Sequence, residues 1–198
     1  KPSDVFLDSL QNVYGLNIPR KPGYDTVESI HAMHEGRIKV FLAMGGNFLS
    51  ATPDTKYTAE ALHKCNLTVQ ISTKLNRSHL ITGKEALILP TLGRSDKDIM
   101  NGEEQFVTTE NSMGVVQMSK GSLKPISDDL LSEPVIVGKL ALTVFGKNKS
   151  QYWEKYLNHY DHIRNDIEKV IPGFENYNQR VRKPGGFYLP NSIKEKTF

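Results

Sequence analysis

Three apolar segments that alternate with helix-forming segments restrict the fold more than any other feature of the chain. Three segments are rich in aliphatic residues: Ile38–Met44, Leu67–Ser72 and Glu85–Pro90. Glycines follow the first, a polar run follows the second, and the third ends in a proline. They predict buried strands. Asp54–Lys64 predicts a helix between the first two, and Asn76–Gly83 predicts a short helical turn before the third. Such alternation is typical of parallel βαβ units, so we predict an α/β fold: a Rossmann-like three-layer domain with a mostly parallel sheet.

The remaining segments predict flanking elements. Ser3–Tyr14 is a short amphipathic segment, and Asp25 or Thr26 can cap a helix that ends near Gly36. Polar residues 93–104 predict an exposed loop, while short strands are predicted at 105–109 and 115–119. Apolar spacing predicts helices at Glu133–Phe145 and Lys149–Ile171, the second stopped by Pro172-Gly173.

These elements divide the chain into four predicted regions. Residues 1–23 form a lead-in segment, 24–147 the Rossmann-like domain, 148–179 a C-terminal helical extension and 180–198 a basic linker. The linker is predicted to contain no helix or strand of its own. Together with the missing initiator methionine, it suggests a piece of a longer protein, with a further domain following.

Composition excludes several functional classes. The 198 residues are 38% hydrophobic, enough for one domain with a sizeable core. No run of about 18 apolar residues is present, so no membrane partner is expected. The first residues lack the apolar core of a secretory signal. The net charge of +3 is not gathered in a basic stripe, which argues against nucleic acid.

A single cysteine limits the redox chemistry of the chain. Cys65 cannot form an internal disulfide, which favours a reducing, cytoplasmic location. One thiol also cannot hold an iron–sulfur cluster, which usually needs four thiolates. The six histidines do not pair with other ligands at a zinc spacing and are interpreted as surface or helix-flank residues. We therefore expect no catalytic and no metal-ligating residue in this chain.

A glycine turn follows the first predicted strand. Gly45, Gly46, Asn47 and Phe48 come directly after Met44, and ligands of open α/β sheets bind outside the carboxyl ends of the strands. Glycines let backbone amides approach a phosphate or ribose, and an asparagine supplies both a donor and an acceptor. The turn matches neither the dinucleotide fingerprint nor a phosphate loop, and a purely structural strand-to-helix turn is the alternative.

Polar side chains follow the next strand at the same predicted edge. Ser72, Thr73, Lys74 and Asn76 supply hydroxyl, cationic and amide groups, which can bind phosphate, ribose or a base. Gln70 is a weaker candidate because it lies within the strand. Two polar turns at one sheet edge predict a nucleotide site, although polar residues also gather wherever a buried strand reaches the surface.

The order of these motifs resembles that of the molybdopterin oxidoreductase family. The matching stretches are Ile38–Asn47, Leu67–Asn76, Glu85–Pro90, Thr108–Gln117 and the helix Glu133–Phe145. Three further segments, Pro19–Asp25, Glu110–Ser119 and Pro184–Asn191, are similar to the formate dehydrogenase-like catalytic subunits of the acid-resistance oxidoreductase branch. The resemblance extends from about Leu16 to Asn191. It departs from the family at Glu85-Ala86, where Ala-Asp is usual, and at Gly114-Val115, where Gly-Arg is usual.

The resemblance implies a cofactor and partners. Catalytic subunits of this family carry two molybdopterin guanine dinucleotides on one molybdenum, often with a 4Fe-4S cluster, and this chain is similar to an internal Rossmann-like domain fragment. Gly45, Gly46 and Asn47, with Ser72, Thr73 and Lys74, would contact one dinucleotide. The other domains of the same parent chain would be its partners, and a small-molecule substrate would bind there. The fragment itself would be inactive.

Two other functions remain open. The chain can be a non-catalytic Rossmann-like domain that binds a nucleotide or a partner at the same sheet edge. A standalone nucleotide-dependent enzyme is the third hypothesis, which the missing phosphate-loop and hydride-cofactor fingerprints disfavour.

Overall fold

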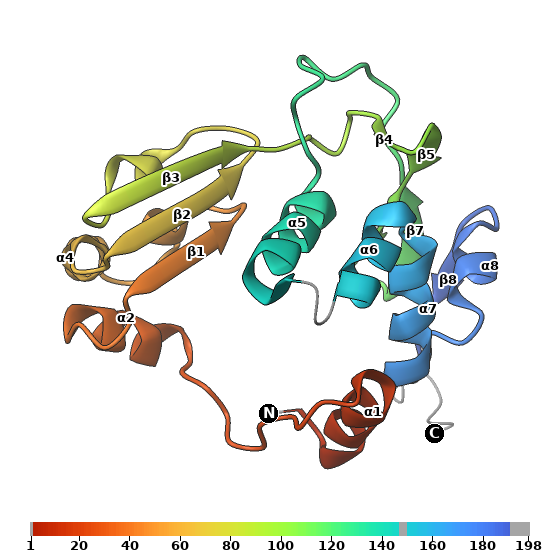
Figure 1. Ribbon diagram of the computed structural model, residues 1–198, viewed down its shortest axis with the longest axis horizontal. Helices are drawn as coiled ribbons and strands as arrows, with labels where there is room; N and C mark the ends of the chain where they lie inside the picture. The colour runs from red at the N-terminus through yellow and green to blue at the C-terminus, as the bar shows by residue number, and fades with distance from the viewer. Residues whose placement is uncertain (1, 147–149, 191–198) are drawn as a thin grey trace. The chain divides into compact units, whose positions relative to one another are not determined.

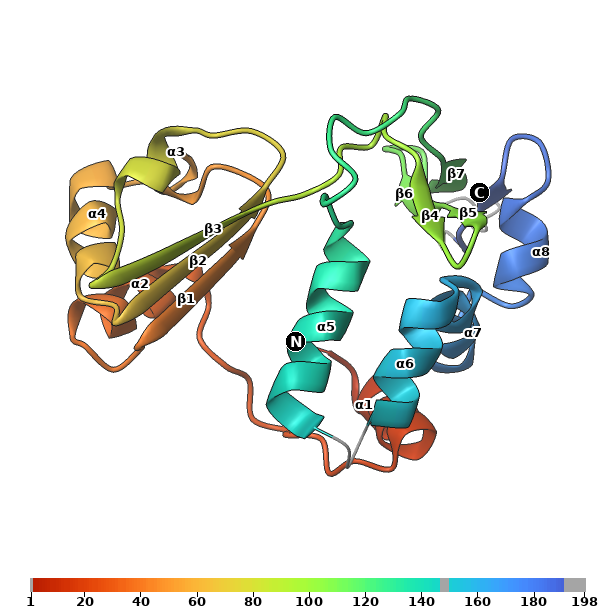
Figure 2. The ribbon, with the colours of Figure 1, turned by 45° about the horizontal axis from the view of Figure 1, so that its top comes forward.

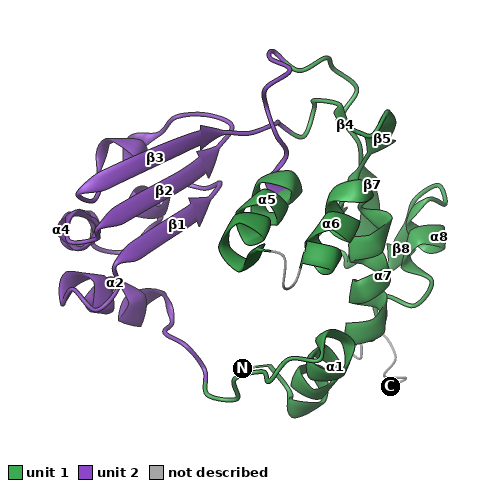
Figure 3. Ribbon diagram, in the orientation of Figure 1, with its two compact units in different colours: residues 1–21, 94–125, 134–198 green, residues 22–93, 126–133 purple. Residues whose placement is uncertain are grey.

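The computed structural model describes residues 2–146 and 150–190, and the chain divides into two compact units (Figure 3). Unit 1 comprises residues 1–21, 94–125 and 134–198. Unit 2 comprises residues 22–93 and 126–133. Unit 2 contains the predicted βαβ region, and it therefore carries the candidate site.

Unit 2 is built on a three-stranded parallel sheet in the order β1-β2-β3 (Figure 1). The register pairs Val40 with Leu67 and Leu67 with Glu85. Along the chain its elements are α2 (Thr26–His34), β1 (Val40–Met44), α3 (Phe48–Ala51), α4 (Thr55–His63), β2 (Leu67–Ser72), the 3-10 helix η1 (Arg77–Leu80) and β3 (Glu85–Pro90). The predicted α/β class and parallel strands are confirmed.

Aspartate caps fix where the two longer helices of unit 2 begin. The Asp25 carboxylate accepts from the Glu28 backbone N–H at 2.8 Å, and the Glu28 carboxylate accepts from the Asp25 N–H at 3.1 Å. This reciprocal capping box satisfies two donors that the helix end leaves unpaired. Asp54 caps α4 by its side chain alone, which accepts from the Tyr57 N–H at 2.9 Å.

One face of the sheet carries the hydrophobic core of unit 2. Buried side chains of α2, α3 and α4 gather there with Phe41 of β1; the fully buried members are Ile30, Met33, Leu49, Ala61, Leu62 and Cys65. Figures 1 and 2 show α2 and α4 together beside the strands. On the opposite face β1 is open, with Val40, Leu42 and Met44 at 55%, 45% and 39% exposed, whereas Val69 and Ile71 of β2, which pair with Leu42 and Met44, are buried.

Unit 1 combines helices with two small antiparallel sheets. Its strands are β4 (Asp98–Met100), β5 (Glu103–Gln105), β6 (Val107–Glu110), β7 (Val115–Ser119) and β8 (Phe187–Tyr188), paired as β4-β5 and β6-β7-β8. Its helices are α1 (Asp4–Tyr14), α5 (Glu133–Phe145), α6 (Ser150–Asn158), α7 (Asp161–Val170) and α8 (Tyr177–Val181). The first residue of α5, Glu133, belongs to unit 2, and the rest of the helix belongs to unit 1. The predicted segment Ser3–Tyr14 is a helix capped by the Ser3 hydroxyl, and the predicted helix Glu133–Phe145 has the expected bounds.

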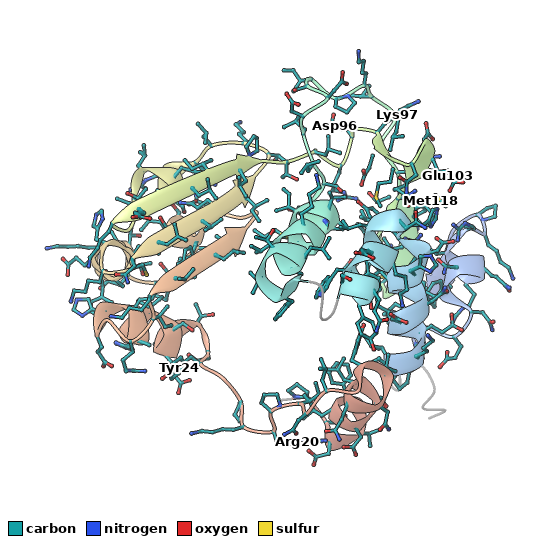
Figure 4. All side chains as sticks on the ribbon, in the orientation of Figure 1. Arg20, Tyr24, Asp96, Lys97, Glu103 and Met118 are labelled. Atoms are coloured by element: carbon teal, nitrogen blue, oxygen red, sulfur yellow. The ribbon has the colours of Figure 1, made fainter. Side chains whose placement is uncertain are left out.

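The prediction of a loop at residues 93–104 is wrong, because β4 and β5 form a hairpin there. Asn101 and Gly102 both have positive φ, at 51° and 83°, as a two-residue turn matched to the twist of the strands requires. Lys97 lies directly before β4 and Glu103 begins β5 (Figure 4). The Asn101-Gly102 pair is a strong sequence signal for a hairpin. The prediction gave more weight to the charged residues around it, which are typical of an exposed loop.

The single helix predicted at Lys149–Ile171 is two helices. The first residue of the predicted helix lies outside the described residues. The helix is interrupted at His159-Tyr160, between the end of α6 and the start of α7. The Tyr160 N–H donates to the Gln105 side-chain oxygen at 3.1 Å, and the Tyr160 hydroxyl donates to Asp98 at 2.5 Å. Tertiary hydrogen bonds to the β4–β5 hairpin therefore interrupt a pattern that is helical throughout.

The tail is not free of regular structure as predicted for residues 180–198. Residues 180–181 end α8, and β8 adds to the sheet by pairing Phe187 with Val116. The Arg180 guanidinium lies 3.9 Å from the centre of the Phe187 ring. Residues 191–198 lie outside the described residues.

A buried carboxylate joins three helices of unit 1. Asp166 of α7 is 3% exposed and accepts from Lys155 Nζ at 2.7 Å and from the Tyr156 hydroxyl at 2.5 Å, both on α6. Lys169 Nζ lies 3.1 Å from its other oxygen. Tyr156 also bonds to the Tyr14 hydroxyl of α1 at 3.1 Å. Because its hydrogen bonds run from α7 to α6 and from α6 to α1, this cluster fixes how the three helices pack.

Among the described residues, no helix is both long enough and apolar enough to cross a membrane.

Candidate functional site

The glycine turn predicted as a site follows β1 in a conformation that requires glycine. Gly45 and Gly46 have φ of 65° and 68°, in the left-handed region that other residues rarely adopt. The Gly45 N–H donates to Ile71 O of β2 at 2.8 Å, so the turn continues the sheet for one residue. A Cβ on Gly46 would meet no atom within 4 Å, and one on Gly45 would meet only Glu133 Oε1 at 3.9 Å. The surface over this turn is therefore open.

Asn76 connects the turn after β2 to the glycine turn after β1. Its side-chain N–H donates to Gly46 O at 2.8 Å, and its side-chain oxygen accepts from the Ser78 N–H at 2.9 Å. The carboxyl ends of β1 and β2 thus meet at one edge, as the parallel register dictates. Of the predicted site residues, the structure joins Gly46, Asn47 and Asn76 in one hydrogen-bonded group.

Ser78 is the centre of this group and was missed in the sequence. It is 4% exposed, donates its hydroxyl to Asn47 Oδ1 at 2.7 Å and accepts from the Leu49 N–H at 2.9 Å. Its backbone oxygen accepts from Gln70 Nε2 at 2.8 Å. Gln70, which is buried within β2, therefore holds Ser78 in position through this bond. The Asn76–Ser78 spacing is typical of an Asx-turn and is the signal that could have found it.

The other predicted site residues have different surroundings. The Ser72 hydroxyl donates to Lys74 O at 2.8 Å and shapes the turn, while the Thr73 and Lys74 side chains are exposed. Phe48 is half-buried and its ring lies 4.8 Å from that of Phe41, so it belongs to the core. The exposed cationic side chain of Lys74 and the open glycine turn are what this edge offers to an anionic ligand.

His79, one of the histidines interpreted as surface or helix-flank residues, lies in η1 and is buried. Its Nδ1 lies 3.0 Å from the Asn76 backbone nitrogen and 3.2 Å from both the backbone oxygen and Oδ1 of Asn76, so Nδ1 accepts or donates according to which ring nitrogen carries the proton. Nε2 is buried and has no hydrogen-bond partner among the described residues. A buried polar atom without a hydrogen-bond partner is costly, so Nε2 calls for a polar group that the described residues do not supply.

A cleft of about 340 Å³ elsewhere in unit 2 does not include the predicted site residues. It lies between α2 and α4, with Ile30, His31 and Tyr57 in its lining. His31 Nδ1 is 3.0 Å from the Tyr57 hydroxyl, and the His34 ring stacks on Tyr57 at 4.4 Å. These contacts hold the two helices together and give the histidines a structural role.

Replacing Ser78 with alanine is expected to loosen the edge between β1 and β2. The buried Leu49 N–H loses its acceptor and Asn47 loses a donor, which costs about 1–3 kcal/mol of unfolding free energy. Amide exchange at Leu49 measures it, because the single tryptophan, Trp153, lies in unit 1 and does not report on unit 2. Ser50→Ala, at an exposed neighbouring serine, is the control. Equal exchange in both variants would contradict the role of Ser78.

Comparison with known proteins relates the whole chain to part of longer ones. It is 52% identical over 195 residues to proteins named uncharacterized oxidoreductase in Mycobacterium tuberculosis and Mycobacterium bovis. It is 43% identical over 196 residues to protein YdeP of Escherichia coli. The matches take in 98% and 99% of this chain but 25% and 26% of the relatives. The chain spans about a quarter of the length of these curated relatives.

A scan against models of protein families finds no match. The chain thus corresponds to one segment of longer proteins, some of which are named oxidoreductases.

Proposed function

We propose that this chain is the nucleotide-binding part of a longer molybdopterin-dependent oxidoreductase of the formate dehydrogenase-like kind. It binds one guanine dinucleotide of the molybdenum cofactor at the carboxyl ends of β1 and β2. The observation that carries the proposal is the bond from the Asn76 side chain to Gly46 O, because it unites the two predicted turns in one edge. The oxidoreductase names of the relatives support the enzyme class.

The residues at this edge fit the nucleotide end of such a cofactor. A phosphate or ribose can approach the backbone at Gly46, where a Cβ would meet nothing within 4 Å. Lys74 is an exposed cation in the turn after β2, and among the described residues it has no ion pair. The Nε2 of His79, in the 3-10 helix that follows the Asn76 turn, is a buried polar atom without a hydrogen-bond partner among the described residues. Glycine backbone, hydroxyl, amide and ammonium groups are the donors that a dinucleotide requires.

In this function the chain binds and orients and takes no part in the reaction itself. Bound molybdenum would supply two-electron oxidation or reduction of a small substrate. Gly45, Gly46 and Asn47 would hold the nucleotide from one turn, and Ser72, Thr73 and Lys74 from the other. The other domains of the longer protein would provide the metal ligands and any iron–sulfur cluster.

Lys74→Ala is expected to weaken the binding of guanosine diphosphate by about 1–2 kcal/mol, because a charge-assisted hydrogen bond is lost. Calorimetric titration of the purified chain measures the change. The folding stability should stay the same, since the Lys74 side chain is exposed.

Lys84→Ala is the matched control, because Lys84 is an exposed lysine at the opposite end of the same sheet, just before β3. Equal losses in the two variants would contradict the placement of the site. Tighter binding of an adenine dinucleotide than of the guanine nucleotide would contradict the proposed ligand and favour a different nucleotide-dependent protein. Release of guanosine monophosphate on acid hydrolysis of the complete gene product tests the cofactor directly.

A further inference from the structure

The outer edge of β3 is the least covered part of the sheet. Leu87 and Ile88 project to opposite faces and are 46% and 42% exposed. The neighbouring Glu85 and Ala86 are also exposed. Strands of parallel sheets are normally covered on both faces, and an apolar edge strand that is open on both is a site for pairing. Helices α2 and α4 therefore leave β3 uncovered even on the face they pack against.

The hydrogen bonds to β2 show which backbone groups of β3 are free. Glu85 N–H donates to Asn66 O at 2.9 Å, and Thr91 N–H donates to Ser72 O at 3.3 Å. Backbone groups of a strand alternate in direction, so the odd-numbered residues face β2. The N–H and C=O groups of Ala86 and Ile88 therefore face outward. Pro90 also faces outward, where its missing N–H costs nothing.

Within the described residues, the chain itself reaches this edge just past β3, where Leu131 pairs in parallel with Thr91 and accepts from the Leu92 N–H at 3.0 Å. That pairing leaves the outward groups of Ala86 and Ile88 unused. The described strands of unit 1 pair with one another, β4 with β5 and β7 with β6 and β8. The relatives are about four times as long as the matched segment, so they contain ample chain from which a strand could come.

We propose that the β3 edge receives an apolar strand from another segment of the longer polypeptide, which pairs with the outward groups of Ala86 and Ile88. The added strand extends the parallel sheet, and side chains that accompany it cover Leu87 on one face and Ile88 on the other. This surface is separate from the nucleotide site, and it rests on the proposed function only in requiring that the gene product is longer than this chain.

Hydrogen exchange of the Ile88 amide tests the proposal. In the complete product of the gene, we expect it to exchange at least about tenfold more slowly than in the 198-residue chain, because pairing protects it. Equal rates would overturn the proposal. A rate in the 198-residue chain that slows as its concentration rises would also overturn it, because a second copy would then occupy the edge.

A proline variant provides the second measurement. Ala86→Pro removes an outward N–H and leaves the bonds to β2 in place, so the thermal midpoint of the complete product should fall while that of the 198-residue chain stays unchanged. Ala86→Val is the control, because it keeps the N–H. Equal falls in both proteins would overturn the proposal. The effect of Lys74→Ala on guanine nucleotide binding is measured independently of the β3 edge. The failure of one proposal can therefore be told from the failure of the other.

Discussion

Replacing Asp166 with alanine is expected to destabilise unit 1 by about 3 kcal/mol, the lower end of the range for breaking a buried ion pair. The lower end applies because Lys155 and Lys169, which lose their partner, are partly exposed at 33% and 59% and regain water. The Tyr156 hydroxyl loses its acceptor as well. Urea unfolding followed by the fluorescence of Trp153 on α6 measures the change. Glu154→Ala, an exposed carboxylate on α6, should change stability by less than about 0.5 kcal/mol; a similar loss there would contradict the prediction.

Acid should remove the same stabilisation. Burial by itself raises the pKa of Asp166, but hydrogen bonds from Lys155, Tyr156 and Lys169 outweigh burial and lower it below its ordinary value. A lowered pKa in the folded chain stabilises it above the unfolded pKa of about 3.9, and the stabilisation disappears as the pH falls further. Asp166→Asn should therefore make the loss of stability below about pH 4 shallower. An unchanged acid slope would show that other carboxylates control it.

Gly186→Ala is expected to cost about 3 kcal/mol or more, because two penalties add. Gly186 has φ of 69°, and a Cβ there would lie 2.0 Å from Val116 O of β7. Backbone must move to relieve this overlap, and the short β7–β8 pairing is what can yield. Loss of the Val116–Phe187 pairing would also release Phe187 from the core with Tyr177 and Val181.

Gly185→Ala separates the two penalties. Gly185 also has positive φ, at 82°, but a Cβ there would meet nothing within 4 Å. It should cost only about 1 kcal/mol, from backbone strain alone. Unfolding free energies of the two variants, measured by Trp153 fluorescence, give the steric part as their difference. Equal costs would mean that the Val116 contact relaxes freely.

The regular elements of unit 2 could be predicted because local and tertiary preferences agree there. The apolar runs of β2 and β3 were found with their bounds unchanged, and Asp25 caps its helix by local chemistry alone. In unit 1 the two disagree. The α6–α7 helical pattern is continuous, yet Tyr160 bonds to Gln105 and Asp98, residues more than fifty positions away, and these bonds break the helix. No local pattern contains that information.

Part of the candidate site could likewise be predicted from the sequence, and part of it depends on tertiary contacts. The glycine turn and the polar turn after β2 were visible because each follows a strand end directly. Ser78 was missed because its importance depends on Asn47 and Leu49, which only the parallel pairing brings near it. Phe48 was included by its position beside Asn47, although its ring packs on Phe41.

The chain passes from unit 1 to unit 2 between residues 125 and 126 and returns to unit 1 between residues 133 and 134. This arrangement limits how unit 2 can be transferred by gene recombination. Residues 126–133 return to unit 2, where Leu131 O accepts from the Thr91 hydroxyl at 2.7 Å and from the Leu92 N–H at 3.0 Å. A gene fusion that transferred residues 22–93 alone would leave the buried Thr91 hydroxyl without its acceptor. Recombination can therefore move unit 2 intact only together with the strands of unit 1 that lie between its two parts.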